Sequence, residues 1–143
     1  MIEKIIDTAV ILLLNSKNEI LLQKKDLGYL WFPGKWCMFG GGIEPEEDPM
    51  QTLTRELKEE LGSVPSEVRL FKKTRYTENY FENRKRGGEF HVYTGLFTGK
   101  ISDISLNEGG GFAFFAKEEL SSVPIIDYNL VAINEYYDSL TSR

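Results

Sequence analysis

The chain has 143 residues, and 17 lysines and arginines against 22 aspartates and glutamates give it a formal net charge of −5. Its apolar fraction of 41% and charged fraction of 27% are typical of a globular protein, and its length predicts a single domain over residues 1–143. One cysteine and one histidine exclude an internal disulfide and a zinc site built from several such residues. Any metal site must therefore rely on oxygen ligands.

No segment has the features of a membrane span. The longest apolar run, residues 9–14, is far shorter than the roughly 20 residues that a span requires. The first residues alternate charged and apolar side chains and lack the layout of a signal peptide. We therefore expect a cytoplasmic protein with no membrane partner.

The first part of the chain predicts a series of strands. Residues 5–14 are rich in β-branched side chains and predict a buried strand. A turn signal follows at residues 15–18, and residues 19–25 predict the second arm of a hairpin. Residues 26–35 predict a loop. Residues 36–39 predict a short strand that ends at three glycines, Gly40, Gly41 and Gly42.

A helix is predicted over residues 49–61. Asp48 is a natural N-cap, Pro49 suits the first helical position, and Gln51 stands at the spacing of a capping box. Gly62 is a C-terminal stop signal. One apolar stripe follows the helix and consists of Met50, Leu53, Leu57 and Leu61.

The second half predicts two strands, over residues 68–76 and 89–97, on either side of a basic segment. A short strand over residues 111–116 and one helical turn over residues 117–120 come next. Asp127 then caps a helix whose apolar face consists of Leu130, Ile133 and Tyr137. This order of β-rich and helical segments predicts an α+β domain with a mixed β-sheet packed against helices.

Charge is unevenly distributed along the chain. Residues 44–60 hold seven acidic and two basic residues, a balance equal to the net charge of the whole protein. Residues 72–86 hold six basic and two acidic residues. This separation suits a divalent cation together with an anionic ligand, although charge runs are more often solvated surface. The acidic balance does not favour long nucleic acid as a partner.

Three carboxylates share one face of the predicted helix. Glu56, Glu59 and Glu60 follow the i, i+3, i+4 spacing, so they form one stripe beside the leucines. Like charges at these spacings repel one another, and a divalent cation among them reverses the sign of that energy. A solvated glutamate-rich face is the alternative interpretation.

The helix and the segment before it resemble the signature box of the Nudix hydrolases, Gly-x5-Glu-x7-Arg-Glu-U-x-Glu-Glu-x-Gly-U, where U is a bulky aliphatic residue. Eight of the nine specified positions match, and they are Gly41, Glu47, Arg55, Glu56, Leu57, Glu59, Glu60 and Gly62. The exception is Ser63, where the family has an aliphatic residue.

The resemblance implies the Nudix fold, a mixed β-sheet sandwiched between α-helices. It also implies a MutT-like pyrophosphohydrolase that uses Mg²⁺ or Mn²⁺ for water attack on phosphorus in a nucleoside triphosphate or similar nucleotide. The implied metal ligands are the Gly40 carbonyl, Glu56, Glu59 and Glu60. The implied structural residues are Gly41, Glu47, Arg55 and Gly62, with Glu47 and Arg55 as an ion pair.

The general base and the substrate contacts stay open at this point. The catalytic candidates are the box residues Glu59 and Glu60 and a loop residue, Glu108. Arg75, Arg84 and Arg86 are candidates for binding phosphate. Trp36 is a candidate for base stacking, and Tyr80 lies near the tyrosine position of diadenosine polyphosphate hydrolases, although ordinary packing explains both aromatic residues. His91 and Cys37 are predicted to be packing residues.

Two other functions are alternatives to hydrolysis. A Nudix-fold sensor would bind a nucleotide without cleaving it, but such proteins typically lose box carboxylates that this chain keeps. An isopentenyl diphosphate isomerase requires a catalytic cysteine and a histidine-containing metal site, which a single Cys and a single His do not favour. The sequence is compatible with a homodimer and does not identify the nucleotide or the preferred metal.

Overall fold

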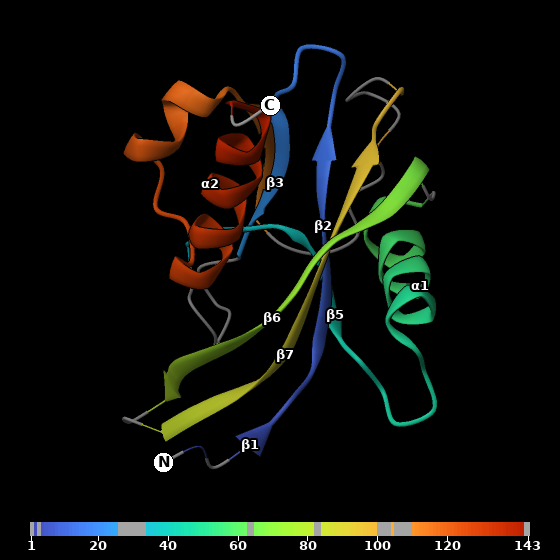
Figure 1. Cartoon of the computed structure of the whole chain (residues 1–143), viewed down its shortest axis with the longest axis vertical. Coiled ribbons are helices and arrows are strands. Elements are labelled where there is room, and N and C mark those ends of the chain that lie inside the picture. Colours follow the sequence, from blue (N-terminus) through green and yellow to red (C-terminus); the bar gives the residue numbers. More distant parts are fainter. Residues whose placement is uncertain are drawn as a thin grey trace.

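The computed structural model describes residues 2, 4–25, 34–62, 65–81, 84–99, 104 and 110–141, with only the backbone described at residues 80 and 81. The strands are β1 (Lys4–Ile5), β2 (Thr8–Leu14), β3 (Ile20–Lys24), β4 (Trp36–Cys37), β5 (Phe39–Gly42), β6 (Ser66–Phe81), β7 (Arg84–Leu96) and β8 (Gly111–Phe115). The helices are α1 (Pro49–Leu61), the 3₁₀ helix η2 (Lys117–Ser122) and α2 (Asp127–Thr141) (Figure 1).

Strand β2 is the centre of a mixed sheet. On one side it pairs in parallel with β7, from Thr8 opposite Phe90 to Leu14 opposite Leu96. On the other side, β5 pairs antiparallel with the first half of β2, and β3 pairs antiparallel with its last two residues. Strands β4 and β8 extend the sheet from β3, while β6 and β1 both pair with β7. Strands β5 and β3 therefore pair with the same edge of β2 and diverge from each other.

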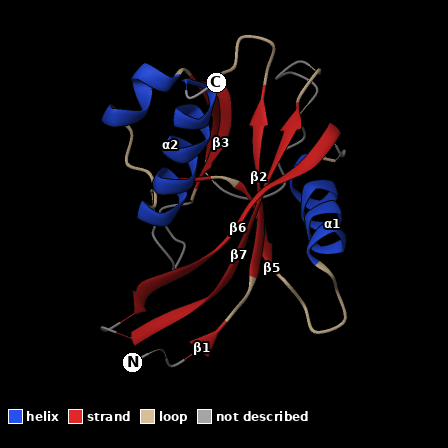
Figure 2. Ribbon diagram, viewed as in Figure 1, coloured by secondary structure: helices blue, strands red, loops and turns tan. Residues whose placement is uncertain are grey.

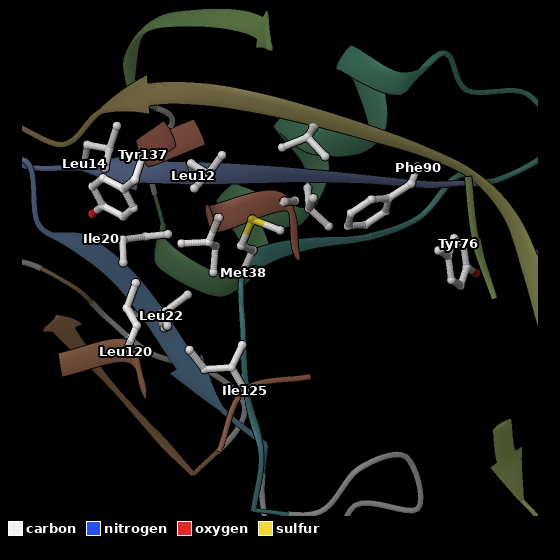
Figure 3. Packing of buried hydrophobic residues seen from close by; sticks show 14 residues of the cluster. Leu12, Leu14, Ile20, Leu22, Met38, Tyr76, Phe90, Leu120, Ile125 and Tyr137 are labelled. Carbon is white, nitrogen blue, oxygen red and sulfur yellow. The ribbon is translucent and has the colours of Figure 1, made fainter. Parts of the chain in front are cut away.

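The two helices α1 and α2 lie on opposite sides of the central strands (Figure 2). Strand β2 contributes to both interfaces, because its side chains alternate between the two faces. Val10, Leu12 and Leu14 belong to the core under α2, which Figure 3 shows, and Ala9, Ile11 and Leu13 belong to the core under α1. A strand covered on both faces is apolar throughout, which explains the uninterrupted run that the sequence displays here.

Helix α1 begins and ends as the sequence predicts. Asp48 and Gln51 form a reciprocal capping box through two hydrogen bonds of 2.8 and 2.9 Å between side chains and backbone. Gly62 ends the helix in the left-handed conformation at φ 79°. The buried leucines Leu53, Leu57 and Leu61 pack against β2 and β5, but Met50 is 39% exposed. Met50, the first residue of the predicted apolar stripe, therefore lies outside the core under α1.

The β6–β7 hairpin is longer than predicted. The ladder continues from Arg75 opposite Glu89 down to Phe81 opposite Arg84, through residues expected to form a loop. Opposite charges face each other across this part of the hairpin, because Glu78 pairs in register with Arg86. Cross-strand pairs of this kind stabilise strand pairing, so a segment whose composition suggests a solvated loop becomes part of the sheet (Figure 1).

Three further elements differ in their limits. The predicted strand over residues 5–14 is interrupted between β1 and β2, where the Asp7 carboxylate accepts a hydrogen bond of 2.8 Å from the Glu89 backbone. The three glycines lie inside β5 rather than after a strand. The helical turn at Lys117 is present as η2. Neither α1 nor α2, with 13 and 15 residues, has the length and apolar content needed to cross a bilayer.

Candidate active site

A cleft of 550 Å³ lies between α1 and α2, where β5 leaves the edge of β2. Its volume falls within the range of small-molecule sites. Polar and charged side chains occupy one wall, and they are Gln23, Lys24, Lys25, Glu56, Glu59 and Glu60. The glycines of β5 form the floor beside them. The rest of the lining includes Ile6, Arg86, Phe90, Ile126, Tyr128 and Asn129.

The loop before α1 is held to the helix by Arg55. Its Nε donates to Glu47 Oε2 at 2.7 Å, and its Nη2 donates to Glu47 Oε1 at 2.9 Å. The Thr52 hydroxyl donates a third hydrogen bond of 2.8 Å to the same carboxylate. Hydrogen bonding from Arg55 lowers the pKa of Glu47 to about 2. This carboxylate is thus fully committed to fixing the loop.

Glu60 is the buried member of the acidic stripe, with 5% of its surface exposed. Its Oε2 accepts a hydrogen bond of 2.5 Å from the Gln23 side-chain amide on β3. Its Oε1 accepts one of 3.2 Å from the Gly40 backbone on β5. Three elements therefore fix the position of one carboxylate, since a buried charge requires such partners. Gly40 has φ 137°, and a Cβ there would meet the Ala9 carbonyl oxygen at 2.1 Å, so this position requires glycine.

Glu56 lies directly against β5. A Cβ on Gly41 would come within 2.6 Å of Glu56 Oε1, so the absence of a side chain at Gly41 makes room for this carboxylate. Arg55 Nη1 donates to Glu56 Oε1 at 3.0 Å and lies 3.6 Å from Glu59 Oε2. The side chain of Glu59 is 50% exposed. The three carboxylates thus lie along one wall of the cleft, from the buried Glu60 to the half-exposed Glu59.

The donor set at this wall consists of oxygen atoms, which Mg²⁺ and Mn²⁺ prefer. Across the described ranges, no three acidic side chains are gathered closely enough to hold an ion by themselves. Mg²⁺ is usually bound through one or two carboxylates together with water and substrate phosphates rather than in an all-protein cage. The residues therefore suit a divalent ion whose remaining ligands are water and phosphate oxygens of the substrate.

The residues predicted to bind the substrate lie in different parts of the structure. Arg86 lines the cleft. Trp36 instead packs on the core under α2, with its ring 5.0 Å from Phe115. Arg75 and Arg84 lie exposed on the hairpin and do not line the cleft. The side chain of Tyr80, and all of Glu108 and Ser63, lie outside the described residues.

Gln23 is a site residue that the sequence reasoning missed. It is buried on β3, among leucines, and donates to a carboxylate 37 positions further along the chain. A polar side chain inside an apolar strand was the only local signal for it. Asn129 is a second such residue, because it lines the cleft from α2 and accepts a hydrogen bond from the Met38 backbone.

His91 and Cys37 are buried in strands, as predicted. Burial raises the pKa of the Cys37 thiol to about 11. The thiolate is therefore strongly disfavoured at neutral pH, although the residue lines the cleft. A cysteine in this state is a poor nucleophile.

Two curated relatives are similar to parts of this chain. A prenyl-diphosphate phosphatase of Methanosarcina mazei is 35% identical over 94 residues, which cover 65% of this chain and 49% of that protein. Nucleoside triphosphatase NudI of Klebsiella pneumoniae is 42% identical over 55 residues, which cover 38% of this chain and 39% of that protein. The chain thus spans about half the length, or less, of these curated relatives.

A similar solved structure and a family match both agree with the geometry of the cleft. The crystal structure of a MutT protein from Methanosarcina mazei Go1 matches the whole length of both chains with a TM-score of 0.76 at 20% identity, a likeness that shows the fold. The NUDIX domain matches residues 4–133, which include every described element of the cleft. The chain belongs to the NUDIX domain family.

Proposed function

We propose that the protein is a pyrophosphohydrolase that uses Mg²⁺ or Mn²⁺ to cleave a nucleoside triphosphate or a similar nucleotide by water attack on phosphorus. The observation that carries the proposal is the meeting of Glu56, Glu59 and Glu60 with the glycine floor of β5 in one cleft. Family membership and the names of the two curated relatives support a hydrolase of diphosphate compounds.

In this proposal Glu56, Glu59, Glu60 and the Gly40 carbonyl supply ligands to the metal, and water and substrate phosphate oxygens supply the rest. The metal, when bound, offsets phosphate charge and lowers the pKa of a coordinated water. Gln23 and the Gly40 backbone orient Glu60 through the hydrogen bonds described above. Lys24 and Lys25 bring positive charge to the same wall, where polyphosphate oxygens would lie.

The proton of the attacking water needs an acceptor. Glu60 is 5% exposed and the Glu56 side chain is 19% exposed, so solvent reaches neither carboxylate easily. Glu59 extends from the same face of α1 with half of its side chain exposed. We propose Glu59 as the acceptor, with Glu60 as the alternative inside the box and Glu108 as the alternative outside it.

An activity panel tests the proposal. The purified chain is incubated with Mg²⁺ or Mn²⁺ and with nucleoside triphosphates, ADP-ribose, dinucleoside polyphosphates and geranyl diphosphate, and phosphate or pyrophosphate release is measured. We expect turnover of a nucleotide that EDTA abolishes and either metal restores. Glu60→Gln is expected to lose about 10²–10⁴-fold in kcat, whereas Glu135→Gln, which removes an ion pair with Lys72 outside the cleft, is expected to match the wild type.

Two results would redirect the proposal. Nucleotide binding without turnover under any condition would favour a sensor that recognises a nucleotide. Preferential turnover of geranyl diphosphate would favour the activity that the name of the M. mazei relative describes. The apolar residues Ile6 and Ile126 in the cleft make this second candidate worth the assay.

A further inference from the structure

An ion pair of the β6–β7 hairpin borders the cleft. Arg86 on β7 donates from Nε to the carboxylate of Glu78, its register partner on β6. The two side chains are 18% and 5% exposed. Arg86 lines the cleft, and Glu78 lines an adjoining hollow of 400 Å³. Tyr128 and Ile126 line both spaces, so the pair stands where the two meet.

The Glu78 carboxylate is incompletely satisfied in this position. Its Oε2 is buried and has no hydrogen-bond partner among the described residues. Burial raises the pKa of Tyr128, and both the Glu78 charge and a hydrogen bond between the two side chains raise it further. A buried acceptor without a donor typically costs about 1–3 kcal/mol, so fold stability alone does not explain why this oxygen lies here.

Aromatic rings pack together around Tyr128, beside this ion pair. The Tyr76 and Tyr128 ring centroids are 4.8 Å apart, and the Phe90 ring meets Tyr128 edge-on at 5.2 Å. Figure 3 shows Phe90 and Tyr76 at one end of the core under α2. The Tyr76 hydroxyl donates a hydrogen bond of 2.6 Å to the Ile6 carbonyl, which fixes the Tyr76 ring. Planar surfaces and a guanidinium–carboxylate pair thus lie together.

Resting on the proposed function, we infer that the Glu78–Arg86 pair recognises the hydrogen-bonding edge of the substrate's nucleobase. Arg86 touches the base, and its guanidinium, which carries five N–H donors, suits the carbonyl and ring-nitrogen acceptors of a base. Glu78 is a positioning residue, because its ion pair with Arg86 fixes the direction of the guanidinium. Tyr128, which is only partly buried, supplies a flat surface against which a ring packs.

The same chemistry disfavours an apolar substrate. A prenyl chain here would displace water from the Arg86–Glu78 pair without supplying donors or acceptors, and desolvating charged groups without partners is costly. A nucleobase replaces the lost water contacts with hydrogen bonds. The pair is therefore a specificity determinant that separates nucleotides from prenyl diphosphates.

The test compares substrates with and without a base. The Glu78→Gln, Arg86→Gln and Arg86→Lys variants are assayed with the four common nucleoside triphosphates, and inorganic tripolyphosphate serves as a base-free inhibitor. We expect kcat/KM for the preferred nucleotide to fall about 10- to 100-fold, the range expected for losing a hydrogen bond to a charged group, mainly through KM. We expect the preference among the four bases to narrow and the inhibition constant of tripolyphosphate to stay unchanged.

Two controls separate recognition from folding. Lys72→Gln removes an ion pair of the same strand with Glu135, outside the cleft, and should leave all constants unchanged. Arg86→Lys keeps the charge opposite Glu78 but lacks the planar fork. It should melt near the wild-type temperature and still lose base preference.

Several outcomes would overturn the inference. One is an equal loss for nucleotides and tripolyphosphate, which indicates a purely structural pair, and another is unchanged nucleotide kinetics. A third is a wild-type preference for geranyl diphosphate that the variants do not alter. If the wild type cleaves nothing, the proposed function fails, and nucleotide affinity measured by calorimetry then decides. Weaker nucleotide binding by the variants than by the wild type supports the inference. Equal nucleotide binding by wild type and variants, or no nucleotide binding by either, overturns it.

Discussion

Arg55 and Glu47 face each other across eight positions of sequence in a two-point contact, with Nε and Nη2 of the guanidinium 2.7 and 2.9 Å from the two carboxylate oxygens. Parallel hydrogen bonds of this kind restrict both position and orientation. Because Arg55 also contacts Glu56 and Glu59, the same side chain connects the loop with the acidic wall of the cleft.

Acid should weaken the contribution of Glu47 to folding stability within a defined pH range. Its pKa is about 2 in the folded protein against 4.5 ordinarily. A depressed folded-state pKa stabilises the protein above pH 4.5, and this stabilisation is lost as the pH falls toward 2. We therefore expect wild type to be more stable than Glu47→Gln at pH 7, with the difference constant down to about pH 4.5 and shrinking below it. Denaturant unfolding at a series of pH values measures this, and a difference independent of pH would contradict it.

Gly41→Ala should damage the site without unfolding the chain. The new Cβ would lie 2.6 Å from Glu56 Oε1, so Glu56 must move. We expect metal affinity to fall about 10- to 100-fold, the range reported for disturbing the surroundings of a metal ligand. Gly42→Ala is the matched control, because its Cβ meets only the Ile6 Cγ2 at 3.2 Å. Mn²⁺ titration measures both variants, and equal affinities would show that Glu56 is not a ligand.

Gln23→Leu should weaken metal binding through Glu60. The substitution removes the amide that donates to Glu60 Oε2 at 2.5 Å. A buried acceptor without its donor is destabilised by about 1–3 kcal/mol, and we expect a decrease of about 10- to 100-fold in metal affinity. Gln51→Leu makes the same chemical change at the helix cap, so it should lower the melting temperature while metal affinity is retained. If both variants bind metal equally well, Gln23 has no role in the site.

Truncating Leu57 and truncating Met50 should change the free energy of unfolding by very different amounts, although the two residues share one helical stripe. Leu57 is fully buried in the core under α1, and truncation to alanine should cost about 2–5 kcal/mol. Met50 is 39% exposed, and the same truncation should change stability by less than about 1 kcal/mol. Chemical denaturation gives both values, and comparable losses would mean that Met50 is buried in solution.

The start and end of α1 were predictable because their determinants are local. The Asp48–Gln51 capping box, the spacing of Leu53, Leu57 and Leu61, and the left-handed Gly62 all act within a few positions of one another. The same holds for the alignment of Glu56, Glu59 and Glu60, which helical periodicity places on one face. Family membership, which the box indicated, is confirmed by the match over residues 4–133.

Tertiary structure alone decided which distant residues complete the cleft. Gln23 reaches Glu60 only because β3 and β5 share one edge of β2. Glu78 meets Arg86 only because the hairpin register places them opposite each other, and the segment they occupy resembles a solvated loop in the sequence. Helical caps and periodicity are encoded within single turns, whereas strand pairing depends on contacts between distant segments whose partners no local pattern specifies.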